Sequence, residues 1–228
     1  MKVDNSTSHK STVFDAQVRS TIPYYDNFHQ ETLSLVKSIK KKPRIWLDTG
    51  CGTGTLILKA IRDFPNTRFL LADPSRNMLI QARKKLARAK SVSFLPPTPT
   101  EKLAPVLHER PDVITAIQAH HYLSPDKRQE ATRACYEILN DNGLYVTFEN
   151  IRPLTESGIK IGKTRWYQYQ IVNGRSRKTA KKHLDRFDKG FFPITIEEHL
   201  ELYRKCQFNV VELFWYSQMQ AGFYCQKL

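Results

Sequence analysis

The chain has 228 residues, 40% of them hydrophobic and 25% charged, which is typical of a globular protein with one full core. Its formal net charge of +14 indicates attraction to anionic partners. No apolar run is long enough to span a membrane, the N-terminus lacks a signal-peptide pattern, and the four cysteines have no metal-ligand spacing. We therefore expect a cytoplasmic protein with reduced cysteines, no metal site and no membrane contact.

The polar residues 1–12 are predicted to form a disordered tail, and residues 13–228 to form one domain. The first regular helix is expected from about residue 27 to residue 39, where apolar side chains recur with helical spacing. An apolar strand over residues 44–48 follows directly.

A glycine-rich loop follows that strand, with glycine at positions 50, 52 and 54 and a helical pattern from Thr55 onwards. Glycine has no Cβ, so this backbone can turn sharply and approach a ligand closely. A second strand, residues 67–73, ends in Asp73 about 20 residues further on, the spacing at which an acid reaches a ribose hydroxyl in open α/β sheets. This pair of features predicts a nucleoside site.

The loop differs from a dinucleotide-binding fingerprint. That fingerprint is G-x-G-x-x-G, which places a pyrophosphate on a helix N-terminus. Here the pattern is D-x-G-x-G-x-G and begins at Asp48, whose carboxylate would repel a pyrophosphate. The loop therefore suits a cationic ligand without phosphate.

The rest of the chain continues the alternation of strands and helices. Further strands are predicted over residues 91–95, 112–119, 144–148, 209–216 and 221–226, and further helices from residue 75, over 125–139 and over 195–206. Only residues 217–220 separate the last two strands, which indicates a hairpin. We predict an α/β fold: a Rossmann-like seven-stranded sheet with helices on both faces and the last strand antiparallel. Residues 149–192 interrupt the alternation and are predicted to form a helical lid.

Two segments carry a family resemblance. Residues 48–54 followed by residues 72–78 resemble motif I and the second-strand acid of class I S-adenosylmethionine (SAM)-dependent methyltransferases. Over nearly the whole chain, the sequence is similar to the group of the tRNA 5-carboxymethoxyuridine carboxy-SAM synthase and related bacterial small-molecule methyltransferases. This similarity rests on residues 14–25, 166–174, 195–199 and 205–224. The resemblance implies an enzyme with SAM as cofactor and S-adenosylhomocysteine (SAH) as product.

The expected cofactor contacts combine chemistry with this resemblance. The Asp73 carboxylate can accept both ribose hydroxyls, and Asp48 can supply negative charge near the sulfonium. In the related enzymes an acid after the third strand often meets the adenine, and Thr98 stands near that place here. The predicted cofactor-binding residues are Asp48, Gly50, Cys51, Gly52, Gly54, Asp73, Pro74, Met78, Thr98, Gln118 and Ala119.

Catalytic candidates follow the fourth and fifth strands, at the rim where open α/β sheets bind ligands. They are His121, His120 and Glu149, with His121 as the candidate general base. The alternative is that one histidine packs in the core and the other caps a helix, because transfer to an already nucleophilic atom needs positioning rather than a base. The predicted substrate contacts are Tyr25, Arg152, Arg165, Trp166 and Tyr169.

The sequence thus predicts a SAM-dependent methyltransferase that acts on a small anionic or aromatic molecule, as a monomer or homodimer. The first alternative is an RNA-modifying enzyme related to SAM or carboxy-SAM chemistry, in which the basic residues 160–189 hold RNA. In that case the arginine that holds the extra carboxylate in the synthase has two candidates, Arg177 and Arg186. The second alternative is a SAM-binding regulatory protein without catalysis.

Overall fold

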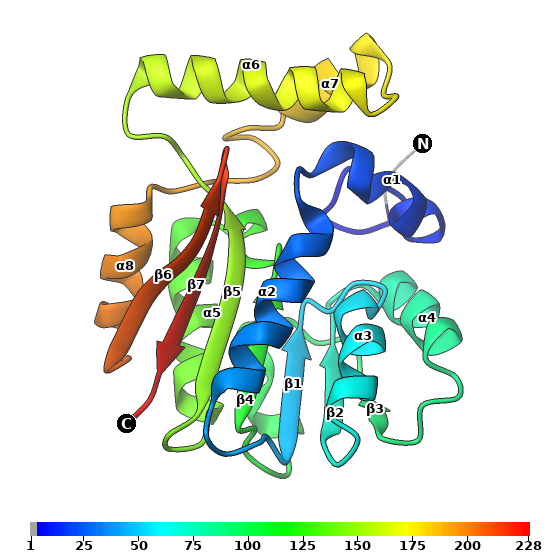
Figure 1. Ribbon diagram of the computed structural model, residues 1–228, viewed down its shortest axis with the longest axis vertical. Coiled ribbons are helices and arrows are strands. Elements are labelled where there is room, and N and C mark those ends of the chain that lie inside the picture. The colour runs from blue at the N-terminus through cyan, green and yellow to red at the C-terminus, as the bar shows by residue number, and fades with distance from the viewer. Residues whose placement is uncertain (1–3) are drawn as a thin grey trace.

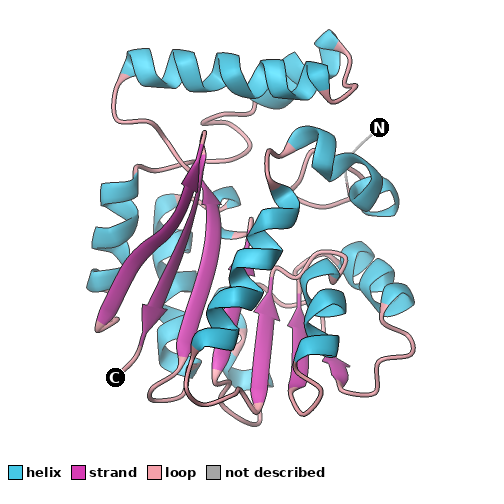
Figure 2. Cartoon of the chain, viewed as in Figure 1, coloured by secondary structure: helices cyan, strands magenta, loops and turns pink. Residues whose placement is uncertain are grey.

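The computed structural model describes residues 4–228. Within this range, seven strands form one sheet in the order β3-β2-β1-β4-β5-β7-β6 (Figures 1 and 2). The strands are β1 Ile45–Thr49, β2 Arg68–Ala72, β3 Val92–Phe94, β4 Val113–Ile117, β5 Leu144–Asn150, β6 Val210–Ser217 and β7 Gln220–Gln226. Strands β1 to β5 pair in parallel, whereas β7 runs antiparallel to both β5 and β6. The predicted fold class is confirmed.

Helices cover both faces of the sheet. The helices are α1 Phe14–Thr21, α2 Tyr25–Ser38, α3 Thr55–Asp63, α4 Arg76–Lys85, α5 Pro125–Ile138, α6 Glu156–Val172, α7 Arg177–Leu184 and α8 Ile196–Lys205. In Figure 1, α2 and α3 lie in front of the sheet, and α5 and α8 lie behind it. One core contains Phe28 and Trp46, and the other contains Tyr145 and Tyr203. Each such buried side chain contributes about 1.5–3 kcal/mol of transfer free energy. None of the helices in the described range is long and apolar enough to span a bilayer.

A short chain of hydrogen bonds connects β1 and β4 inside the sheet to Asp48, at the end of β1. All five residues of β1 are buried, as its apolar run predicts for a central parallel strand. Trp46 donates its indole N–H to the Thr115 hydroxyl on β4 at 3.0 Å, and Thr115 donates to the Asp48 carboxylate at 2.7 Å. The Asp48 carboxylate is therefore fixed at the end of β1.

The insertion after β5 forms α6 and α7, which lie across the carboxyl ends of the parallel strands (Figure 1). Trp166 of α6 is fully buried and donates its indole N–H to the Thr21 carbonyl at 2.7 Å. Its ring also packs against His183 and Phe191. These contacts fasten the insertion to α1, and its role as a lid remains a prediction.

The expectation of a disordered tail is wrong for residues 4–12. Asp4 accepts hydrogen bonds from the Ser11 amide and hydroxyl, at 3.1 and 2.7 Å, and Ser11 opens a short 3₁₀ helix, Ser11–Val13. His9 is buried, with its Nδ1 2.9 Å from the Gln17 side-chain oxygen. The polar composition of residues 4–12 does not reveal these contacts, because the groups that hold the segment lie in α1 and in the insertion. The first three residues of the predicted tail lie outside the described range.

Candidate active site

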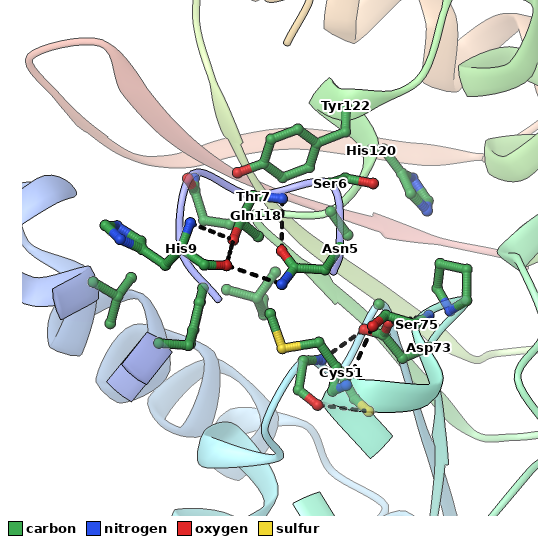
Figure 3. A pocket seen from close by; sticks show the side chains of 18 of the residues that line it. Asn5, Ser6, Thr7, His9, Cys51, Asp73, Ser75, Gln118, His120 and Tyr122 are labelled. Atoms are coloured by element: carbon green, nitrogen blue, oxygen red, sulfur yellow. Dashed lines mark hydrogen bonds between the residues drawn. The ribbon is translucent and has the colours of Figure 1, made fainter. Parts of the chain in front are cut away.

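A cavity of about 340 Å³ lies at the carboxyl edge of the parallel strands, within the size range of small-molecule sites. The loops after β1, β2, β3 and β4 form one side of it, and α1, α2 and residues 4–9 form the other (Figure 3). Its lining on the loop side includes Asp48, Gly50, Cys51, Gly52, Asp73, Pro74, Ser75, Met78, Pro99, Thr100, Glu101, Gln118 and Ala119. Most of the predicted cofactor residues therefore meet in one place.

The glycine loop is shaped for close approach. Gly50 has φ +62°, and a Cβ there would lie 2.6 Å from the Ala119 Cβ. Gly52 has φ +53°, yet a Cβ there would meet nothing within 4 Å. The first glycine lets two loops pack together, and the second leaves bare backbone facing open space.

The Asp73 carboxylate is held by two main-chain amides. The Gly52 N–H donates to one oxygen at 2.9 Å, and the Ser75 N–H donates to the other at 2.8 Å. Each oxygen therefore keeps acceptor capacity for one hydroxyl of a diol. Burial raises the pKa of Asp73 to about 6 against the effect of these amides, and burial raises the pKa of Asp48 to about 7.

These pKa values predict that SAM binding depends on pH. Only ionised Asp73 can accept from both ribose hydroxyls, and its pKa of about 6 means that the proton returns as pH falls through 6. We expect the Kd for SAM to be about tenfold higher at pH 5 than at pH 8. Calorimetric titration across this range measures it, and a constant Kd would contradict the assigned role of Asp73.

Buried polar atoms without a partner mark where a ligand would bind. The Gln118 side-chain amide nitrogen and the Glu101 Oε2 are both buried without a hydrogen-bond partner in the described range, and both residues line the cavity. Gln118 also has φ +55°, a strained value for a non-glycine residue and typical of functional sites. Together with the Asp73 acceptors and the bare Gly52 backbone, these atoms fit the diol and polar edges of SAM.

Three predicted cofactor residues differ in how they are placed relative to the cavity. Gly54 sits at the start of α3 rather than in the cavity lining. Thr98 is buried and donates to the Pro96 carbonyl, while Thr100 and Glu101 line the cavity in its place. Cys51 does line the cavity, and burial raises the pKa of its thiol well above the usual value. That shift disfavours a nucleophilic thiolate.

The structure joins His121 and Glu149 in a buried pair. The His121 Nδ1 lies 2.8 Å from the Glu149 Oε2, and the His121 main-chain amide donates to the same oxygen at 2.9 Å. Because a carboxylate only accepts, Nδ1 carries the proton and Nε2 is an acceptor, which has no partner in the described range. Burial lowers the pKa of His121, so the ring is neutral. His121 itself does not line the cavity, but Tyr122 does, with its ring centroid 4.3 Å away from that of His121.

His120 has a different surrounding. It lines the cavity, and its two ring nitrogens contact the Tyr145 hydroxyl at 3.2 Å and the Thr100 hydroxyl at 3.3 Å. Burial lowers its pKa to about 4. Because both ring nitrogens already have hydrogen-bond partners, we interpret His120 as a structural residue rather than a general base.

Several flat rings also line the cavity. Phe14, Tyr25, His29, Tyr122 and His183 contribute to it, and of these only Tyr25 was predicted as a substrate contact. Burial lowers the pKa of both His29 and His183 to about 3, so these rings are uncharged. His29 Nδ1 is buried without a partner in the described range, which makes it a second candidate to receive a proton.

The other predicted substrate residues do not reach the cavity. Arg152 pairs with Asp188, Arg165 is exposed on α6, and Trp166 is part of the core. Tyr169 donates its hydroxyl to the Arg19 carbonyl at 2.7 Å. In the described range no group of three or more histidine, cysteine or acidic side chains is placed to hold a metal.

Comparison with known proteins agrees with this geometry. The profile of the methyltransferase domain family matches residues 47–145. The carboxy-S-adenosyl-L-methionine synthase of Nitratiruptor sp. is 23% identical over 89% of this chain and 84% of its own length. The synthase of the same name from Campylobacter concisus is 28% identical over 89% of this chain and 85% of its own length.

A solved structure shows the same fold. An O-methyltransferase family protein from Burkholderia thailandensis superposes with a TM-score of 0.62 at 13% identity, over 94% of this chain. This chain spans only 61% of the length of that protein. The fold, the glycine loop with Asp73 and the match to the methyltransferase domain family over residues 47–145 together indicate a SAM-dependent methyltransferase with SAM as its cofactor.

Proposed function

We propose that the enzyme transfers the methyl group of SAM to a small planar molecule that is aromatic and acidic. The observation that carries this proposal is the continuity of the cavity. The glycine loop and Asp73 line the same cavity as the rings of Phe14, Tyr25, Tyr122 and His183. A flat acceptor stacked among these rings would face the cofactor directly.

Positive charge behind the rings supports an acidic acceptor. After burial, the charges of Arg175 and Arg186 are the next causes that lower the pKa of His183. Neither arginine has a carboxylate partner in the described range, whereas Arg19 and Arg44 each have one within 2.7 Å. An acceptor carboxylate or phenolate would supply the missing negative charge.

We assign separate roles in methyl transfer to the cofactor and to the residues around the acceptor. The SAM sulfonium supplies the methyl group, and the chain holds the acceptor atom in line with it. We propose that the His121 Nε2 removes the proton, although in this structure Tyr122 rather than His121 lines the cavity, and that Glu149 fixes the ring through Nδ1. His29 is the weaker candidate, because its pKa of about 3 makes it a poor base at neutral pH.

A panel of hydroxylated aromatic acids tests the proposal. We expect SAH formation with some members, and expect His121→Ala to lower kcat at least about 100-fold while His29→Ala acts mainly on KM. Neutral aliphatic alcohols serve as control acceptors. SAH formation only with the neutral alcohols, or cofactor binding without any turnover, would contradict the proposal.

A second candidate is synthesis of carboxy-SAM, which the names of the relatives suggest. Arg177 is exposed on α7, whereas the Arg186 guanidinium lies 5.9 Å from the Tyr122 ring at the cavity wall. Arg186 is therefore the better placed of the two arginines to meet a cofactor carboxylate. Mass spectrometry of the cofactor released from purified protein decides: SAM or SAH supports methyl transfer, and carboxy-SAM supports the synthase activity.

A third candidate acceptor is RNA, which the positive charge on the insertion favours. Lys160, Arg165, Arg177, Lys178, Lys182 and Lys189 are exposed there without an ion-pair partner in the described range. If they bind phosphates, tRNA affinity should fall steeply as salt rises. Absence of binding at low salt would exclude RNA.

A further inference from the structure

Residues 4–9, called the strap below, form part of the wall of the cofactor cavity. They line the same cavity as Gly52, Asp73 and Ser75 (Figure 3). A cofactor lying along the glycine loop would therefore have the strap on its other side. No cofactor could enter or leave by that side while the strap is in place.

Besides the hydrogen bonds from Ser11 to the Asp4 carboxylate, contacts at three points hold the strap. At one end, the Ser75 hydroxyl donates to the Asp4 carbonyl at 3.1 Å. In the middle, Arg186 donates to the Ser6 carbonyl at 2.6 Å. At the other end, His9 is buried, and its two ring nitrogens lie 2.9 Å from the Gln17 and Thr21 side-chain oxygens.

The strap between Asp4 and His9 has no apolar anchor. Residues 4–8 carry only polar side chains, and none of these five residues is buried. Segments held by hydrogen bonds near water, without buried apolar contacts, open locally at low cost while the domain stays folded. The buried His9 is then the point about which the strap can open.

Arg186, which donates to the Ser6 carbonyl, lies outside both the strap and the cofactor loop. It comes from the turn after α7 and also donates to the Gly190 carbonyl at 3.1 Å. A Cβ at position 190 would lie 2.8 Å from the Arg186 Nε, so Gly190 leaves the space that this side chain occupies. The guanidinium is thus positioned by the insertion and directed at the strap.

We propose that the strap closes over SAM and SAH, and that Arg186 is the positioning residue that sets how fast they are exchanged. Closing contributes nothing to the chemistry of methyl transfer. It holds the cofactor during turnover and makes opening a required step in SAH release. The inference rests on the cofactor site alone and not on the proposed acceptor.

Stopped-flow fluorescence of SAH dissociation tests this proposal. We expect Arg186→Ala to raise both the dissociation and the association rate at least about tenfold, with a smaller change in Kd, because only the open fraction exchanges ligand. Arg186→Lys keeps a charged donor and should restore part of the effect. Arg177→Ala removes an exposed cation from the same insertion and serves as the matched control.

Hydrogen exchange supplies a second readout that does not use activity. Amides of residues 4–9 should exchange more slowly when SAH is bound, and this protection should be lost in Arg186→Ala. Wild-type dissociation rates in a folded Arg186→Ala protein, or equal acceleration in Arg177→Ala, would overturn the proposal. A failed acceptor panel together with faster SAH exchange would contradict the proposed acceptor and leave the strap intact.

Discussion

Asp73→Ala is expected to weaken binding of SAM and SAH at least about 100-fold. The substitution removes two charge-assisted hydrogen bonds to the ribose diol, each with a net value of about 1.5–3 kcal/mol. The Gly52 and Ser75 amides lose their acceptor, but the loss of stability should be smaller than for Glu149→Ala, because burial raises the pKa of Asp73 and disfavours its charged form. Isothermal titration calorimetry gives the Kd, and a thermal melt checks the fold.

Two companion variants make the Asp73 result specific. Asp73→Asn keeps the shape but accepts through only one oxygen, so its binding should lie between those of the wild type and Asp73→Ala. Asp63→Ala removes a carboxylate that pairs with Lys37 at the end of α3 and should leave binding unchanged. Cofactor binding by Asp73→Ala within threefold of wild type would refute the diol assignment.

Glu149→Ala should cause the largest loss of stability, about 3–5 kcal/mol. Glu149 is fully surrounded and accepts from the His121 amide and ring, from the His120 amide at 3.3 Å and from the Thr147 hydroxyl at 2.7 Å. Its removal leaves these donors buried without an acceptor. Urea unfolding measures the loss, and Glu130→Ala, an exposed acid on α5, is the control.

Glu149→Gln separates stability from catalysis. The amide fills the same space but orients His121 poorly, so we expect a folded protein with kcat at least about 100-fold lower. The hydrogen bond from His121 lowers the pKa of Glu149 against the effect of burial. The carboxylate therefore stabilises the fold fully above its unfolded pKa near 4.5, and its advantage over glutamine should shrink below that value and be lost as pH falls through the folded pKa of about 2. An unchanged kcat would remove the pair from the mechanism.

The glycine loop and Asp73 could be predicted because their chemistry is local. A strand, a bend without side chains and an acid about 20 residues later determine a geometry whatever surrounds them. The seven-stranded sheet with an antiparallel last strand was also predictable, since alternating units and a short final hairpin leave few topologies.

The strap and the ring-lined part of the cavity could not be predicted, because their partners are distant in sequence. Ser6 is held by Arg186, 180 positions away. Helical spacing places His29 on the inner face of α2 but does not say whether that face meets core or cavity.

The predicted substrate contacts in the insertion were wrong for a similar reason: the sequence does not say which face of α6 meets the core. The turn of α6 points Trp166 inward to Thr21 and leaves its neighbour Arg165 exposed. Arg165 and Trp166 were both predicted to contact the substrate, whereas neighbouring residues on a helix point in different directions.

The fate of a labelled methyl group tests the account most directly. The protein is incubated with methyl-labelled SAM and a fractionated cell extract, alongside Asp73→Ala. We predict label in an acidic, aromatic small molecule with wild-type protein, and none with Asp73→Ala. Label that enters RNA or protein, or no transfer to any fraction, would contradict the proposed function.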